Sequence, residues 1–224
     1  MICLVTDRRR LVAAGAAPGA ARACLVAQIR HASDAGIDLI QVRERDLESG
    51  ALAALVAELL AVTRGTATRL VVNDRIDVAL ACGADGVHLR GDSIPVAAAR
   101  RLAPREFLIG RSVHDVDEAI GAGGADYLIA GTVFPSSKAA AAPLLGIDGL
   151  RAIVLAVGRP VLAIGGIAGG RIAEVAAAGA AGFAAIGLFM ASQPDAEVGG
   201  CGVVELRQTV KNARSRFDRP NTTP

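Results

Sequence analysis

The sequence predicts a single-domain α/β fold, a (β/α)8 TIM barrel. Short runs rich in Val and Ile recur along the chain, and each is followed by a polar or glycine-containing patch and an alanine-rich segment of helical period. These strands are apolar throughout, which is typical of parallel strands covered on both faces. Eight such units in 224 residues are what a compact barrel of this kind needs.

The expected strands and helices alternate along the whole chain. The strands are expected at Ile2–Val5, Leu39–Val42, Leu70–Asn73, Gly86–Leu89, Leu108–Ser112, Tyr127–Ala130, Val161–Ile164 and Phe183–Ile186. The helices are expected at Ala20–Ala35, Ser49–Arg64, Asp74–Cys82, Pro95–Leu102, Asp115–Ala122, Ile147–Val157, Arg171–Ala178 and Val203–Phe217. A doubly wound open sheet is the alternative, but it usually has fewer strands and a glycine fingerprint after the first. Here Val5 is followed by Thr-Asp-Arg-Arg-Arg.

Three connections from a helix to the next strand share one short motif. Each contains a glycine and an alanine just before the strand, at Gly83-Ala84, Gly124-Ala125 and Gly179-Ala180. A glycine at that point fits a left-handed helix C-cap, so we expect these turns at the bottom of the barrel. We expect the barrel domain to span residues 1–213 and residues 214–224 to form a flexible tail.

Composition excludes several classes of protein. Basic and acidic residues nearly balance, at 24 and 22, and aromatic residues are only 3%, so a single-strand nucleic-acid platform is not expected. No apolar run is long enough to span a membrane, and the N-terminus lacks the pattern of a signal peptide. The four cysteines lie far apart without metal or redox spacing. We expect a reduced, cytoplasmic protein.

Polar residues gather just after the expected strands, where a barrel of this kind carries its chemistry. One group consists of Arg43, Arg45, Asn73, Asp74 and Asp92. Arginines clamp phosphate oxygens and carboxylates hold Mg²⁺, so the group suits a magnesium diphosphate. The alternative is a set of salt bridges at the rim, which is what Arg-Glu-Arg-Asp would indicate if it stood alone.

A second group follows the seventh and eighth strands, at Gly165-Gly166 and Ile186-Gly187. Loops at these two positions often bind phosphate through backbone N–H groups, and glycine allows a close approach. The alternative for the glycine pair is a simple tight turn. Lys138 is one of only two lysines among the 24 basic residues, and it could reach a phosphate or be an ordinary surface lysine.

The histidines are less informative. His31 is expected to be exposed on a helix, and His88 lies within a strand, where it could belong to the core or to a site. His114 follows the fifth strand and could act in acid–base chemistry, although a structural or hydrogen-bonding role is favoured.

Six motifs, in this order, resemble the thiamine phosphate synthase and thiazole tautomerase family. They begin with Gln41-Val-Arg-Glu-Arg-Asp-Leu, Val72-Asn-Asp-Arg-Ile-Asp-Val-Ala and Gly83-Ala-Asp-Gly-Val-His-Leu. They continue with Ile109-Gly-Arg-Ser-Val-His, Gly131-Thr-Val-Phe-Pro and Val161-Leu-Ala-Ile-Gly-Gly-Ile. The resemblance spans about Ile2 to Phe189.

The resemblance implies a reaction and a set of site residues. The synthase joins hydroxymethylpyrimidine diphosphate to a thiazole phosphate and releases diphosphate, with Mg²⁺ as helper. By motif, Gln41 and Ser112 would contact the pyrimidine substrate, and Arg43, Arg45 and Asn73 would hold its diphosphate. The metal would fall to Asp74 and Asp92. Further substrate contacts would come from His114, Thr132, Ser136, Ser137, Gly166, Ile186 and Gly187. The catalytic residues would be Arg43, Arg45, Ser112 and Lys138.

The chain departs from the synthase pattern at particular positions. Arg45 stands where the synthase has Lys, and Ser93 stands where it has a metal-binding Asp, with Asp92 one residue early. The loop that ends in Lys138 is one residue shorter, and Gly187 replaces a Ser. Thr132 stands where the tautomerase branch has a His, although His114 is shared with that branch.

Three hypotheses of function follow. The leading one is a synthase-like transferase that acts on phosphorylated small molecules. The alternatives are an isomerase that acts on a thiazole phosphate and a barrel of the same family that binds a phosphorylated ligand without catalysis. Neither nucleic acid nor membrane is expected as a partner, and a homo-oligomer is left open.

Overall fold

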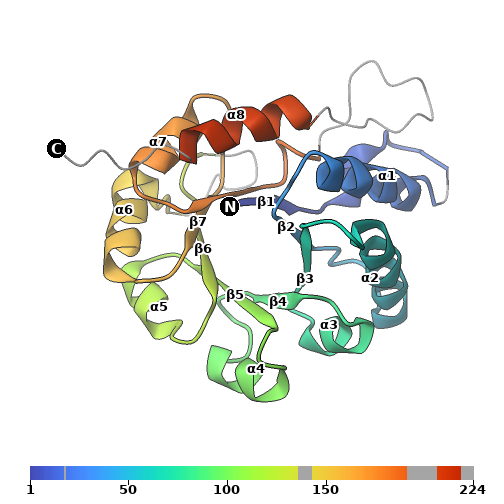
Figure 1. The fold of residues 1–224 in the computed structure, drawn as a ribbon, viewed down its shortest axis with the longest axis horizontal. Coiled ribbons are helices and arrows are strands. Elements are labelled where there is room, and N and C mark those ends of the chain that lie inside the picture. The colour runs from blue at the N-terminus through green and yellow to red at the C-terminus, as the bar shows by residue number, and fades with distance from the viewer. Residues whose placement is uncertain (18, 136–142, 191–205, 218–224) are drawn as a thin grey trace.

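Eight parallel strands, β1 to β8, close into a barrel in sequence order in this computed structural model, and α-helices cover its outside (Figure 1). The barrel closes where β8 pairs with β1, with Phe183 opposite Ile2. The structure describes residues 1–17, 19–135, 143–190 and 206–217. The predicted fold class is confirmed.

The elements fall close to their predicted positions. The strands are β1 (Ile2–Val5), β2 (Leu39–Val42), β3 (Arg69–Asn73), β4 (Gly86–Leu89), β5 (Leu108–Val113), β6 (Tyr127–Gly131), β7 (Val161–Ile164) and β8 (Gly182–Ala185). The helices are α1 (Ala20–Asp34), α2 (Ser49–Thr63), α3 (Ile76–Cys82), α4 (Val96–Leu102), α5 (Val116–Gly121), α6 (Gly146–Ala156), α7 (Arg171–Ala177) and α8 (Arg207–Phe217).

Two local differences from the prediction lie at the mouth of the barrel, where the strands end. Helix α3 begins at Ile76 rather than at Asp74, because Asp74 has a left-handed backbone with φ of 66°. The Asp74 N–H donates to the His88 carbonyl at 2.9 Å, so the residue belongs to the strand ends. A short 3₁₀ helix, η1 (Arg8–Leu11), follows β1 and was not predicted.

Apolar side chains pack in two separate layers. Alternate strand residues fill the barrel interior, among them Val5, Leu39, Val71, Ile129 and Leu162. The intervening residues face outward and pack against the helices in a larger cluster. This alternation follows from the two-residue period of a strand, and it fixes which side chains reach the mouth.

The bottom of the barrel is held by a repeated carboxylate. Asp38, Asp85 and Asp126 each precede an even-numbered strand, and each accepts the N–H of a residue on the preceding strand. The acceptor distances are 2.6 Å from Ile2, 2.7 Å from Leu70 and 2.7 Å from Ile109, in that order. The glycines at the turns have the expected positive φ, at 67° for Gly83, 86° for Gly124 and 85° for Gly179.

The C-terminal helix continues past the expected domain boundary at residue 213. Helix α8 extends to Phe217, and Arg214 on it pairs with Asp38 at 2.7 Å. Cys3 and Cys82 are free thiols, but Cys24 is disulfide-bonded, which the expectation of reduced cysteines did not foresee. In the described part of the chain, no helix has the length and hydropathy that crossing a membrane requires.

Candidate active site

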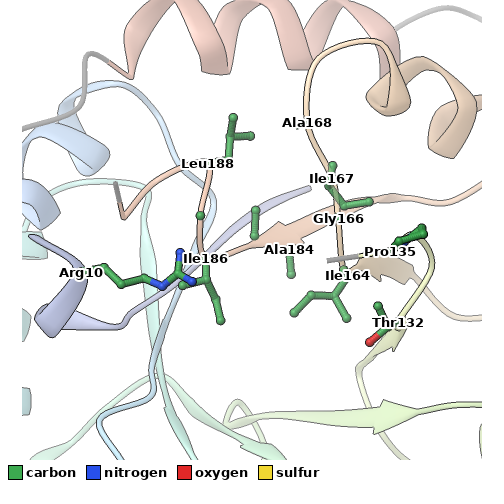
Figure 2. A pocket seen from close by; sticks show the side chains of 13 residues that line it. Arg10, Thr132, Pro135, Ile164, Gly166, Ile167, Ala168, Ala184, Ile186 and Leu188 are labelled. Atoms are coloured by element: carbon green, nitrogen blue, oxygen red, sulfur yellow. The ribbon is translucent and has the colours of Figure 1, made fainter. Parts of the chain in front are cut away.

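Two hollows open at the mouth of the barrel. The β6–β8 cavity has a volume of about 540 Å³ and is lined by Arg10, Thr132, Pro135, 164–168 and 184–188 (Figure 2). The β2–β4 hollow has a volume of about 350 Å³ and is lined by Val42, Glu44, Arg45, Leu47, Leu52, Asn73, Asp74, Arg75 and Arg90. Because β3 and β7 lie on opposite sides of an eight-stranded barrel, the two hollows face each other across the mouth.

Backbone geometry shapes the β6–β8 cavity. Gly165 and Gly166 have φ of 101° and 64°. A Cβ on Gly165 would clash with Thr132, and one on Gly166 would lie 2.6 Å from the Pro135 carbonyl oxygen. Arg171 holds this turn, since its guanidinium donates to the Gly166 carbonyl at 2.8 Å and lies over the Phe134 ring. Both glycines are therefore required by the turn itself.

A polar layer of side chains from β2 to β6 lies inside the barrel. The Gln41 amide donates to Asn73 Oδ1 at 2.8 Å. The buried His88 ring lies 2.9 Å from the Ser112 hydroxyl and 3.2 Å from the Tyr127 hydroxyl. Burial, with the nearby charge of Arg111, lowers the pKa of His88 to about 3, so the ring is neutral near pH 7.

Arg8 pairs with both carboxylates of the Arg43-Glu44-Arg45-Asp46 segment. Its guanidinium bonds Glu44 at 2.7 Å and Asp46 at 2.7 Å, and this pairing lowers the pKa of Asp46 to about 2. Within the described residues, neither Arg43 nor Arg45 has a salt bridge. The segment was expected either to bind a diphosphate or to form salt bridges at the rim. Salt bridges account for its two carboxylates, and its two arginines remain available for an anion.

Arg43 is half-buried beside β1. Its backbone N–H donates to the Thr6 hydroxyl at 2.9 Å. Burial, and then repulsion from Arg45, lowers the pKa of Arg43, while Asp7 acts in the opposite direction. Cationic side chains thus gather at this rim at some electrostatic cost, which an anion placed among them would relieve.

Asp74 lines the β2–β4 hollow, and Ser93 contacts it from the loop after β4. The Ser93 hydroxyl donates directly to Asp74 Oδ1 and accepts the Arg90 N–H at 2.8 Å. The Arg90 guanidinium lies 3.6 Å from Asp74 Oδ2 and 2.6 Å from Asp92 Oδ2. The Asp92 side chain is 70% exposed and pairs with Arg90, and it does not line the hollow.

The other predicted residues are spread around the mouth. Thr132, Gly166, Ile186 and Gly187 line the β6–β8 cavity, whereas His114 is exposed, pairs with Glu118 at 3.0 Å and lines neither hollow. The predicted Ser136, Ser137 and Lys138 lie outside the described residues.

Sequence reasoning assigned no role to two arginines of the mouth. Arg10 lines the β6–β8 cavity, and Arg90 bridges two of the acidic residues. The available signal was position alone, because both follow the end of a strand within a few residues. Neither stands in a motif that marks it.

The fold and its polar mouth define the chain as a (β/α)8-barrel enzyme. The family model described as thiamine monophosphate synthase matches residues 5–189. A thiamine-phosphate synthase of Methanoregula boonei is 47% identical over 191 residues, which cover 84% of this chain and 87% of that protein. The chain belongs to the thiamine monophosphate synthase family.

Solved structures agree at two levels of similarity. The thiamine phosphate pyrophosphorylase from Pyrococcus furiosus superposes with a TM-score of 0.75 and 36% identity over 95% of this chain and 96% of that one. A 3-hexulose-6-phosphate synthase superposes with a TM-score of 0.67 at 16% identity, over 96% of this chain and 99% of that chain. The second similarity is one of fold alone.

Proposed function

We propose that the chain is a thiamine-phosphate synthase, a transferase that joins hydroxymethylpyrimidine diphosphate to a thiazole phosphate. The observation that carries the proposal is the pair of hollows across one mouth, with acidic and cationic groups in one and glycine backbone in the other. Two phosphorylated substrates would each occupy one hollow, and their reacting atoms would meet between them. Family membership and the relative from Methanoregula boonei support the same assignment.

The proposed reaction is a substitution at the pyrimidine methylene carbon. Its C–O bond breaks and diphosphate leaves with the electron pair, while the thiazole nitrogen supplies the lone pair for the new C–N bond. Charge therefore builds up on the departing diphosphate, and stabilising that charge is the main task of the site.

The β2–β4 hollow and the adjoining end of β2 supply the groups for the diphosphate. Arg43 and Arg45 would bind its oxygens, because Arg8 already neutralises the neighbouring Glu44 and Asp46. The Asn73 amide faces the same hollow and is oriented by its hydrogen bond from Gln41. An arginine that is not paired with a carboxylate can direct its N–H groups at a leaving phosphate and stabilise its charge.

The donor set in this hollow fits a magnesium ion that takes most of its ligands from substrate and water. Among the described residues, no group of three or more His, Cys, Asp or Glu side chains could hold a metal alone. Asp74, with the Ser93 hydroxyl beside it, would hold the ion together with diphosphate oxygens. When bound, Mg²⁺ would neutralise charge on the departing diphosphate. The geometry favours Asp74 over Asp92, which pairs with Arg90.

The other substrate contacts follow from the polar layer and the cavity. Gln41 on β2 and Ser112 on β5 would contact the pyrimidine, with neutral His88 bonded to the Ser112 hydroxyl. Gly166, Ile186 and Gly187 would bind the thiazole phosphate through the backbone that lines the cavity. Thr132 lines the same cavity, and Ser136, Ser137 and Lys138 are proposed to contact the reacting groups.

The test is formation of thiamine phosphate by the purified chain, with and without Mg²⁺. Asp74→Asn should abolish Mg²⁺-dependent turnover, whereas Asp117→Asn, a matched change at an exposed carboxylate on α5, should leave it unchanged. Conversion of a thiazole carboxylate tautomer without any pyrimidine would instead favour the isomerase. Saturable binding of thiazole phosphate with no turnover would favour the non-catalytic barrel.

A further inference from the structure

The β6–β8 cavity has a single charged side chain in its described lining. That side chain is Arg10, while the rest of the lining is apolar, backbone or the Thr132 hydroxyl. Figure 2 shows the guanidinium extending from η1 into the cavity toward Ile186. A cation in an otherwise apolar and glycine-rich cavity is an attractive partner for a phosphate group.

An ion pair with Asp7 orients the Arg10 guanidinium. Its Nε lies 3.3 Å from Asp7 Oδ2, and Asp7 is largely buried beneath it. The NH1 atom lies near the opposite wall, 3.4 Å from the point that a Cβ on Gly187 would occupy. The terminal nitrogens are therefore directed into the cavity, while the Nε edge is held by the protein.

Gly187 gives the guanidinium its space. A Cβ alone would just reach van der Waals contact with NH1, so a longer side chain at 187 would compete with Arg10 for the same volume. The φ of Gly187 is not in the left-handed region, so backbone conformation does not itself require glycine there. Arg171 does not supply this charge, because it donates to the Gly166 carbonyl and lies over Phe134.

We propose that Arg10 binds the phosphate group of the thiazole substrate, in a space that the absent side chain at Gly187 leaves open. The inference rests on the proposed function for the identity of the substrate. Recognition of a phosphate monoester by this cavity does not depend on turnover.

The test is calorimetric binding of thiazole phosphate, its dephosphorylated alcohol and inorganic phosphate to the full chain. Arg10→Gln should weaken binding of both phosphates by about tenfold or more, since one charge-assisted contact is lost, and should leave the alcohol unchanged. Arg9→Gln is the matched control, because Arg9 is exposed on the same 3₁₀ helix and does not line the cavity.

A second variant tests the role of Gly187. Gly187→Val should displace the guanidinium and weaken phosphate binding to a similar degree, and combining it with Arg10→Gln should add little further loss. In turnover, Arg10→Gln should raise the KM for thiazole phosphate and leave that for pyrimidine diphosphate unchanged.

The outcomes separate the two proposals. Unchanged phosphate binding by folded Arg10→Gln, or no phosphate binding by the unmodified chain, would overturn the role of Arg10 whether or not turnover occurs. Arg10-dependent binding of phosphate by a chain that makes no thiamine phosphate would support Arg10 and reject the synthase function.

Discussion

Ser93→Asp should create a metal-dependent stability that the unmodified chain lacks. The Ser93 hydroxyl contacts Asp74 Oδ1 directly, so a carboxylate there would place two like charges roughly 4 Å apart. At an effective dielectric constant of about 20, their repulsion is about 4 kcal/mol. The Asp74 side chain is 34% exposed and Arg90 lies 3.6 Å away, which should reduce the net cost to about 1–2 kcal/mol.

The assay is thermal unfolding in chelator and across a series of Mg²⁺ concentrations. For a chain of this size the loss should lower Tm by about 2–8 °C in chelator, and Mg²⁺ bound by both carboxylates should reverse it. Ser93→Asn is the control, because it has nearly the same shape without the charge. If Ser93→Asp and Ser93→Asn respond identically to Mg²⁺, position 93 does not face the ion and the assignment of Asp74 to the metal loses its support.

Three further outcomes are expected. Asp85→Ala should lower the free energy of unfolding by about 1–3 kcal/mol in chemical denaturation, because it leaves the Leu70 N–H without its acceptor, while Glu106→Ala at an exposed site should change it little. The pKa of His88 is about 6.5 in the unfolded chain and about 3 in the folded protein, so on acidification the unfolded chain gains the proton first. The free energy of unfolding should therefore be at its full value above about pH 6.5 and fall toward pH 3, with a shallower slope in His88→Gln. Asp92→Asn should leave the apparent Mg²⁺ affinity in the synthase assay within about twofold of the unmodified value, and a tenfold loss would show that Asp92 is a ligand.

Strand positions were predictable from sequence because the barrel makes the local signal unambiguous. Most strands, β1, β2 and β4 among them, are buried on both faces, so their apolar runs are nearly continuous, and turn residues bound them on both sides. The start of α3 was missed because Asp74 fits helical patterning. Its left-handed backbone goes with a bond from its N–H to the His88 carbonyl, a contact with the neighbouring strand that local propensity does not encode.

The candidate site was predictable in its location but not in its pairing. Strand order alone brings Arg45, Asn73 and Asp74 to one hollow, with Arg43 beside it at the end of β2. Which arginine pairs with which carboxylate depends on η1, a short element that places Arg8 against Glu44 and Asp46. Asp92 was a candidate ligand by residue type, yet its neighbour Arg90 competes for it at 2.6 Å.

The same segment after β1 serves both hollows. Arg8 neutralises the carboxylates of Glu44 and Asp46 beside the β2–β4 hollow. Arg10, two residues later, extends into the β6–β8 cavity. Asp7, in the same segment, pairs with Arg10 and also favours the charged form of Arg43. A substitution at Asp7 should therefore disturb both phosphate sites, whereas changes to Arg8 or Arg10 should each disturb one. The mouth is organised by the first loop of the barrel, although most of the motifs that indicate its chemistry lie in later ones.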